Sequence, residues 1–181
     1  MKIDDNHLLS EVRQVPSSHC DLRPDSDDIS LLVIHHISLP PFEYGSEDIE
    51  AFFTGTLDPN RHAFFKVIEK MRVSAHCLIR RDGEIIQFVP FDKRAWHAGI
   101  SSFAGRDRCN DYSIGIELEG SEFDAYTPSQ YLALAKLSQL LMSRYDKISP
   151  SRITGHQFIS PLRKSDPGLT FDWPFYRSLL K

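Results

Sequence analysis

The chain is poor in cysteine, and this shortage limits how its fold can be stabilised. Its 181 residues include three cysteines, Cys20, Cys77 and Cys109, which lie far apart and form no C-x-x-C pair. We therefore expect no disulfide framework and interpret all three as reduced thiols in a cytoplasmic protein. A thiol enzyme built on Cys77 or Cys109 stays open as an alternative, although a cysteine in an apolar run such as that around Cys77 is usually buried and inert.

Long apolar segments and an excess of basic charge are also missing. No stretch approaches the roughly 20 apolar residues of a membrane span, and the acidic N-terminal segment has no apolar core of a signal peptide. We therefore expect no membrane association and a cytoplasmic location. The formal net charge is -4 with both signs interspersed, so the basic stripe typical of nucleic-acid binding is absent and no nucleic-acid partner is expected.

The chain is long enough for one complete domain. A domain of 181 residues buries roughly 70% of the surface that its unfolded chain exposes, which is enough for a proper core. The sequence contains no internal repeat, low-complexity tract or linker. We expect a single domain over residues 1–181, acting as a monomer.

Three segments have the patterns of β-strands. Residues 31–34 form a continuous apolar run that ends in His35 and His36, and because strand side chains alternate, only one of these histidines can face a given pocket. Residues 73–79 and 84–89 flank Asp82-Gly83, which predicts a hairpin whose tight turn uses positive φ angles. Residues 113–119 alternate, so Glu117 should lie on the face opposite the isoleucines.

The clearest helix is predicted after residue 127. Thr127-Pro128-Ser129-Gln130 has the form of a capping box with proline at the first helical position, and leucines follow at helical spacing. A last short helix should start near Asp172, which can cap it. Residues 39–73 form a long, irregular, aromatic-rich connection, interpreted either as a helix with a packed loop or as a lid over a pocket.

A short C-terminal stretch gathers groups that suit a metal site. Thr154-Gly155-His156 precedes Lys164-Ser165-Asp166-Pro167-Gly168, and its prolines and glycines argue against a long helix. In an extended segment Lys164 and Asp166 would point the same way. Alternatively, these two residues form a salt bridge in an exposed turn. The chain has eight histidines but no H-E-x-x-H pair, which excludes a helix-borne zinc site of that type.

Several blocks together resemble one family, the zinc amidases related to phage T7 lysozyme. The blocks are residues 31–41, 53–59 (F-T-G-T-L-D-P), 73–83, 90–99 (with A-W-H-A-G), 108–120 (with I-G-I-E) and 154–168 (with R-K-S-D-P-G). The F-T-G-T-L-D-P and R-K-S-D-P-G blocks are similar to the branch that acts on 1,6-anhydro-N-acetylmuramoyl-L-alanine in peptidoglycan recycling. The resemblance implies an α/β (α+β) fold with a central mixed β-sheet flanked by α-helices, as in T7 lysozyme and peptidoglycan-recognition proteins.

The resemblance also implies a site and a mechanism. It assigns His35, His156 and Asp166 as ligands of Zn²⁺, a set that leaves one position open for water. The zinc-bound water would be the nucleophile, Glu117 the general base and acid, and Lys164 the residue that stabilises the oxyanion. The expected reaction is hydrolysis of the amide between 1,6-anhydro-N-acetylmuramic acid and L-alanine of an anhydromuropeptide.

Four further residues are candidates for substrate binding. Arg72 and Arg108 match positions expected to hold the peptide carboxylates, and Trp96 would stack on the sugar. One departure from the family is His36, because Asn is usual after the first ligand. His36 stays open as a metal ligand, but strand alternation makes it a poor co-ligand with His35, so we expect it to line the pocket. The competing function is a non-catalytic muropeptide-binding module, which the retained ligand and catalytic positions argue against.

Overall fold

The computed structural model describes residues 1–180 of the chain. Its centre is a six-stranded mixed sheet in the order β1-β5-β4-β9-β3-β10. Two adjacent inner strands, β3 (Leu31–Ile37) and β9 (Ser113–Glu119), run parallel, with His35 in register with Glu117. The other strands of this sheet are β1 (Arg13–Gln14), β4 (Cys77–Ile79), β5 (Ile85–Gln87) and β10 (Ile153–Gly155).

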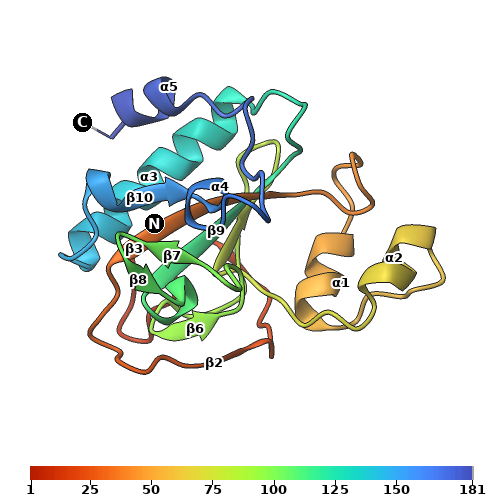
Figure 1. Cartoon of the computed structure of the whole chain (residues 1–181), viewed down its shortest axis with the longest axis horizontal. Helices are drawn as coiled ribbons and strands as arrows, with labels where there is room; N and C mark the ends of the chain where they lie inside the picture. The colour runs from red at the N-terminus through yellow and green to blue at the C-terminus, as the bar shows by residue number, and fades with distance from the viewer. Residues whose placement is uncertain (181) are drawn as a thin grey trace.

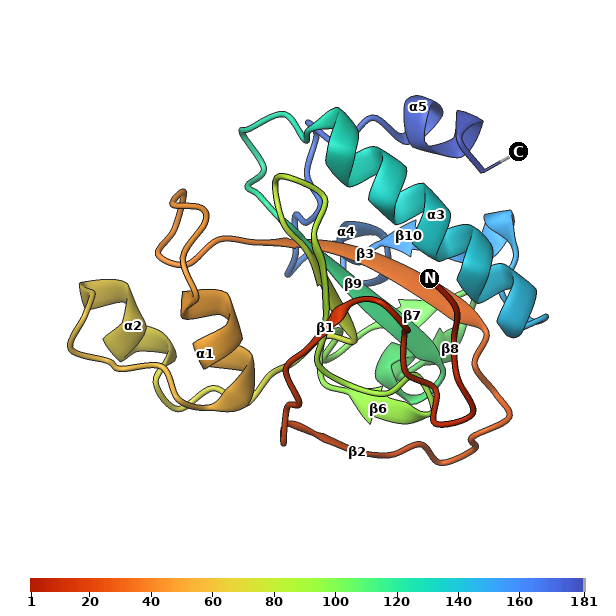
Figure 2. The same cartoon turned by 180° about the vertical axis from the view of Figure 1, so that it is seen from behind.

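The sheet lies between unlike layers (Figures 1 and 2). Along one face runs α3 (Pro128–Arg144), with α5 (Trp173–Ser178) beyond it. On the other side lie two small antiparallel pairs, β2 (Cys20–Leu22) with β6 (Lys93–Ala95) and β7 (Ser102–Phe103) with β8 (Arg106–Asp107). Two 3-10 turns, η1 (Cys109–Asp111) and η2 (Pro150–Arg152), and the short α4 (His156–Ile159) complete this arrangement. The expected central mixed sheet with flanking helices is confirmed.

The alternation of β9 sorts its side chains as predicted. Ile114, Ile116 and Leu118 join the buried cluster that α3 covers. Gly115 and Glu117 therefore face the opposite layer. All seven residues of β9 are buried, because both faces of the strand are covered. The alternation therefore brings Glu117 to the face of the sheet opposite α3.

The predicted helix caps are confirmed. The Thr127 hydroxyl accepts the Gln130 N–H at 3.1 Å, and the Gln130 side-chain oxygen accepts the Thr127 N–H at 3.1 Å. Asp172 likewise caps α5 by accepting the Phe175 N–H at 2.9 Å. Each reciprocal bond satisfies a backbone donor that the first helical turn leaves free.

The predicted hairpin is present with shorter strands and a different turn. Gly83 has φ of 93°, but Asp82 does not join it in the left-handed region. The Gly83 N–H bonds the Arg80 carbonyl at 2.9 Å, so the turn spans residues 80–83. Asp-Gly therefore supplies one positive φ here, where the sequence predicted more than one.

The connection over residues 39–73 contains two short helices, α1 (Asp48–Thr54) and α2 (Ala63–Ile68). They stand beside the sheet and apart from α3, as Figure 1 shows at its right-hand side. Phe53 and Phe65 are buried in a second apolar cluster that also contains Phe88. The interpretation as helix with packed loop is confirmed, with one helix more than expected.

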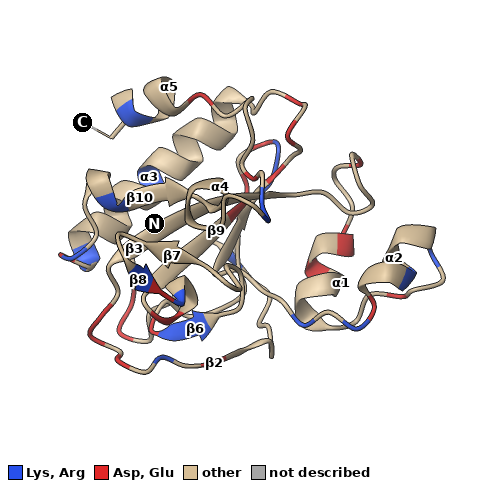
Figure 3. Ribbon diagram, in the orientation of Figure 1, with Lys and Arg blue, Asp and Glu red and all other residues tan. Residues whose placement is uncertain are grey.

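Charges of both signs are spread over the molecule. Figure 3 shows lysine and arginine on strands, helices and loops without a continuous stripe. Within residues 1–180, no helix has the length and apolar composition needed to cross a bilayer.

Candidate metal centre and active site

The sheet register brings two histidines from distant parts of the chain together. β10 pairs parallel to β3 with Gly155 opposite Ile34, so the next residues, His156 and His35, leave the pair at the same end. Asp166 approaches them from the loop after α4. The Nδ1 atoms of the two histidines are 3.0 Å apart, and Asp166 Oδ2 lies 2.8 Å from His35 Nδ1 and 3.0 Å from His156 Nδ1. All three residues are buried.

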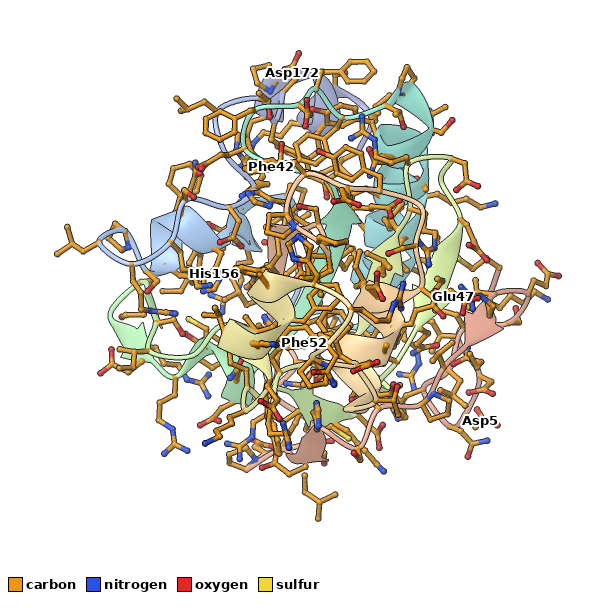
Figure 4. The ribbon with its side chains drawn as sticks, turned by 90° about the vertical axis from the view of Figure 1, so that its right-hand side faces the viewer. Asp5, Phe42, Glu47, Phe52, His156 and Asp172 are labelled. Atoms are coloured by element: carbon orange, nitrogen blue, oxygen red, sulfur yellow. The ribbon has the colours of Figure 1, made fainter. Side chains whose placement is uncertain are left out.

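Local contacts explain why Asp166 reaches this point. Its carbonyl accepts the Gln157 N–H at 2.8 Å, which ties the loop to α4. A Cβ at position 155 would stand 2.7 Å from Pro167 Cδ, so only glycine lets the loop lie against the end of β10. Figure 4, which views the molecule from the side of α1 and α2, marks His156 together with Phe42 and Phe52 of the neighbouring segment.

The hydrogen-bond partners of His156 suit a cation in this triangle. Its Nε2 is 3.0 Å from the Ala98 carbonyl oxygen, which can only accept, so Nε2 carries the proton. A neutral His156 then directs the bare lone pair of Nδ1 at a carboxylate oxygen. One proton cannot serve three acceptor atoms that lie 2.8 to 3.0 Å apart, whereas a metal ion can.

The donor set fits zinc in type and in size. Two imidazole nitrogens and one carboxylate oxygen with a position left over form a catalytic zinc set. Tetrahedral zinc with bonds of about 2.0–2.1 Å keeps its ligand atoms about 3.3 Å apart, so the triangle would widen by only a few tenths of an ångström.

The protonation states of His35 and Asp166 also suit metal binding. Burial lowers the pKa of His35 to about 4, against the opposing effect of Asp166. Burial alone would raise the pKa of Asp166, but the adjacent His156 and His35 outweigh it and hold that pKa below its usual range. At neutral pH His35 is therefore neutral and Asp166 ionised, which are the states that bind metals.

Glu117 lies beside the cluster as an uncompensated carboxyl group. It is adjacent to His35 across β3 and β9, and among residues 1–180 its Oε2 has no hydrogen-bond partner. Burial, and then the negative charge of Asp166, raise its pKa well above the usual range, while Lys164 opposes them. A carboxylate with a raised pKa is a stronger base than an ordinary glutamate. Its strand neighbour Glu119 is instead neutralised by Arg80 at 3.1 Å.

Lys164 is placed differently from the sequence expectation. Residues 161–163 and 166–167 are in turns, and Lys164 is exposed whereas Asp166 is buried. The segment is not fully extended, because the Lys164 N–H bonds the Ser160 carbonyl at 3.0 Å, so the alternation that we expected for Lys164 and Asp166 does not apply. Lys164 nevertheless lies close enough to lower the pKa of Glu117 and of His35.

Two pockets flank the cluster and contain two of the four predicted substrate-binding residues. Arg108 lines a pocket of about 650 Å³ between residues 99–102 and residues 159–163. His36 lines a pocket of about 310 Å³ with Phe42, Phe52 and other apolar residues. Within the described chain, His36 Nε2 is buried without a hydrogen-bond partner. As expected from strand alternation, His35 and His36 face different surroundings.

Arg72 and Trp96 are less directly connected to the cluster. Arg72 lines a neighbouring pocket of about 250 Å³, and its guanidinium donates to the carbonyls of Glu69 and Met71 at 3.0 Å. Trp96 is partly buried and stacks on His19 with ring centroids 6.2 Å apart. Neither residue lines the two pockets beside the cluster.

Arg163 contributes to the site in a way that the sequence did not indicate. Its guanidinium donates to the carbonyls of Ala98 at 2.6 Å and Ile100 at 2.9 Å. It thereby joins the loop that carries Asp166 to the segment beside His156. Its membership of the R-K-S-D-P-G block was the available signal, but an arginine in a turn has no distinctive pattern.

Comparisons with known proteins agree with this geometry. The sequence pattern of the N-acetylmuramoyl-L-alanine amidase family (Amidase_2) matches residues 25–169. The chain is 59% identical over 176 residues to the 1,6-anhydro-N-acetylmuramyl-L-alanine amidase AmpD of Citrobacter freundii, covering 97% of this chain and 94% of that protein. Its fold is similar to a crystal structure of a selenomethionine AmpD derivative, with a TM-score of 0.96, 58% identity and full coverage of both chains.

A more distant structure has been solved with a substrate. It is the complex of the N-acetylmuramyl-L-alanine amidase AmiD from E. coli with anhydro-N-acetylmuramic acid-L-Ala-D-gamma-Glu-L-Lys. The TM-score is 0.62 at 30% identity, over 84% of this chain and 57% of that one. The family match and the near-complete alignment with AmpD lead to one assignment: this chain belongs to the N-acetylmuramoyl-L-alanine amidase family, with the fold of the T7 lysozyme-like amidases.

Proposed function

We propose that this protein is a zinc-dependent amidase that hydrolyses the amide between 1,6-anhydro-N-acetylmuramic acid and L-alanine of muropeptides in peptidoglycan recycling. The observation that carries the proposal is the buried triangle of His35, His156 and Asp166, whose three ligand atoms lie within 4.8 Å of one another. The substrate is proposed from the relatives, because AmpD is a 1,6-anhydro-N-acetylmuramyl-L-alanine amidase and the AmiD complex contains anhydro-N-acetylmuramic acid.

The three triangle residues hold the metal, and two neighbours act on the substrate. Zinc in this set supplies a Lewis acid that lowers the pKa of water toward ~7 and polarises the scissile carbonyl. Glu117 takes a proton from the attacking water and delivers it to the leaving nitrogen, a role that suits a buried carboxyl of raised pKa. Lys164 stabilises the negative charge that develops on the carbonyl oxygen.

The flanking pockets accommodate the two ends of the substrate. Arg108 binds a carboxylate of the stem peptide in the larger pocket, because a guanidinium can meet a carboxylate with two hydrogen bonds. His36 contacts the substrate from the smaller pocket, where its free nitrogen needs a partner. Arg72 assists at the peptide end and Trp96 at the sugar.

The alternative is a non-catalytic muropeptide-binding module of the same fold. Binding alone would not need a carboxyl without a partner beside a complete ligand triangle, because leaving such a group buried costs stability. The geometry therefore favours the enzyme.

One experiment tests the function directly. Metal analysis of the purified protein should show about one zinc per chain, and mass spectrometry of an anhydromuropeptide digest should show the free anhydro sugar and the free peptide. A zinc-loaded protein that binds the muropeptide but releases neither product would support the binding module. Full activity after zinc removal with a chelator would contradict the metal mechanism and favour a thiol enzyme.

The role of Lys164 is tested by its removal. Lys164→Ala should lower kcat by about 100- to 1,000-fold, as expected for a lost oxyanion-stabilising group, while zinc content stays unchanged. Lys136→Ala on the exposed face of α3 is the matched control and should leave kcat unaltered. A zinc-loaded Lys164→Ala protein with near wild-type turnover would remove Lys164 from the mechanism.

A further inference from the structure

The two histidines of the triangle both contact one short segment, residues 97–98, on the side away from the triangle. His35 and His156 both direct Nδ1 into the triangle, so each turns Nε2 the other way. His35 Nε2 lies 2.9 Å from His97 Nδ1, and His156 Nε2 lies 3.0 Å from the carbonyl oxygen of Ala98. Two consecutive residues therefore contact the outer nitrogens of both imidazoles.

The hydrogen-bonding capacity of these atoms settles where the protons lie. When His35 gives its Nδ1 lone pair to a cation, its proton is on Nε2, and His97 Nδ1 must accept it. His97 then carries its own proton on Nε2, which is 3.3 Å from the Ser113 hydroxyl. Ala98 fixes the same arrangement for His156, because a carbonyl oxygen accepts only.

The ring of His97 has little freedom to turn away. A Cβ on Gly115 would lie 2.4 Å from His97 Cγ, so the ring rests directly on the glycine backbone of β9. The backbone N–H groups of His97 and Ala98 both donate to Asn110 Oδ1, at 3.2 and 2.8 Å. Position and tautomer are thus both determined by fixed neighbours.

We propose that His97 is a positioning residue of the metal centre: its Nδ1 lone pair keeps the proton of His35 on Nε2 and so directs the Nδ1 lone pair of His35 at the metal. The inference rests on the proposed metal site and deepens it. A neutral imidazole in the other tautomer presents an N–H to the metal and cannot bind it. Outer partners of metal-bound histidines typically change metal affinity by about 10- to 100-fold when removed.

Replacing His97 by asparagine or by glutamine, whose side-chain amides differ in length, distinguishes a hydrogen-bonding role of His97 from a role in packing alone. An asparagine at position 97 places a side-chain oxygen near the position of the native Nδ1, and a glutamine reaches the position of Nε2 instead. The zinc affinity of His97→Asn should therefore stay within about 3-fold of that of the wild type. His97→Gln and His97→Leu should bind zinc about 10- to 100-fold more weakly than the wild type. Zinc affinity is measured on purified protein by competition with a chromophoric chelator, independently of amidase activity.

Long-range ¹H–¹⁵N NMR of the histidine rings adds a spectroscopic readout. The zinc-loaded wild type and His97→Asn proteins should both show His35 protonated at Nε2 alone. Equal zinc affinity in the wild type and His97→Leu would overturn the inference, as would rescue by glutamine that matches rescue by asparagine. If the leucine variant fails to fold, the difference in zinc affinity between His97→Asn and His97→Gln still tests the inference. A wild-type protein that takes up no zinc would overturn the proposed metal function as well, so the two failures are distinguishable.

Discussion

At the scale of single residues, Glu117 combines burial with the absence of a partner. Because its carboxyl is buried in the folded protein, its pKa lies well above the ordinary value of 4.5. The unfolded chain therefore releases this proton at a lower pH than the folded protein does. The stability that protonated Glu117 contributes is complete below the unfolded pKa and is lost as the pH rises through the folded pKa.

Glu117→Gln should remove this pH dependence from the metal-free protein. Above about pH 4.5 the stability of the wild type should fall relative to the variant, by at most about 1.4 kcal/mol per pH unit. Urea unfolding after zinc removal, repeated at several pH values, measures the difference. Glu69→Gln, at an exposed position after α2, is the control and should track the wild type. Parallel curves for the wild type and Glu117→Gln would show that the carboxyl is not buried as described.

With zinc bound, Glu117→Gln should also lower kcat by about 100- to 10,000-fold.

The positions of single side chains in the site were the features least predictable from the sequence. The three triangle residues came from a family resemblance, because spacing alone could not select among eight histidines. His35 and His156 are 121 positions apart, and only the pairing of β3 with β10 brings them together. The exposure of Lys164 could not be predicted either, since it depends on a turn rather than on alternation.

At the scale of elements, local patterns were strong enough to predict most of the fold. The capping box of α3 and the alternation of β9 depend on neighbouring residues, and both are present. The short pairs β2–β6 and β7–β8 were not predicted, because two- and three-residue strands have no periodicity to detect. The helix that begins at His156 was likewise too short to be anticipated.

The capping box provides a stability prediction that is separate from catalysis. Thr127→Ala removes the bond from Gln130 N–H and the bond that the hydroxyl donates to the Arg81 carbonyl at 2.7 Å. We expect a loss of about 1–2 kcal/mol in the free energy of unfolding, measured by urea titration, with kcat unchanged. Ser129→Ala, at an exposed position in the same turn, should change stability by less than about 0.5 kcal/mol. Equal stability of both variants would contradict the cap.

Arg108, which follows β8, provides a test of substrate orientation. Arg108→Ala should raise KM for tripeptide substrates by about 10- to 100-fold, as expected when a hydrogen bond to a charged group is lost. KM for a substrate truncated after L-alanine should change little. Arg106→Ala is the control, because Arg106 pairs with Asp28 and does not line the pocket. A similar rise for both substrates would place Arg108 away from the peptide.

At the scale of the whole molecule, the segment of residues 39–73 lies beside the candidate site and packs against the sheet through its buried phenylalanines. Phe42, Phe64 and Met71 from this segment are partly exposed and line the pocket that contains His36. Apolar groups that are open to solvent beside the proposed substrate pocket suit a segment that closes over bound ligand.

Hydrogen exchange tests whether the segment closes. Adding the anhydro-sugar product should slow amide exchange within residues 39–73 and leave the centre of α3 unaffected. Unchanged exchange across the segment at saturating product would exclude closure and leave it as a static wall.

The chain separation of the triangle residues has a consequence for how the protein would acquire the proposed metal. His156 and Asp166 are 10 positions apart, whereas His35 is 121 positions from His156. In an unfolded chain, closing the longer loop costs about 2 kcal/mol more in entropy than closing the shorter one. Unfolded protein can therefore present the C-terminal pair but rarely the full set. The proposed metal would therefore find its complete ligand set only after β3 and β10 have paired, so we expect zinc to bind mainly to chains that have already folded.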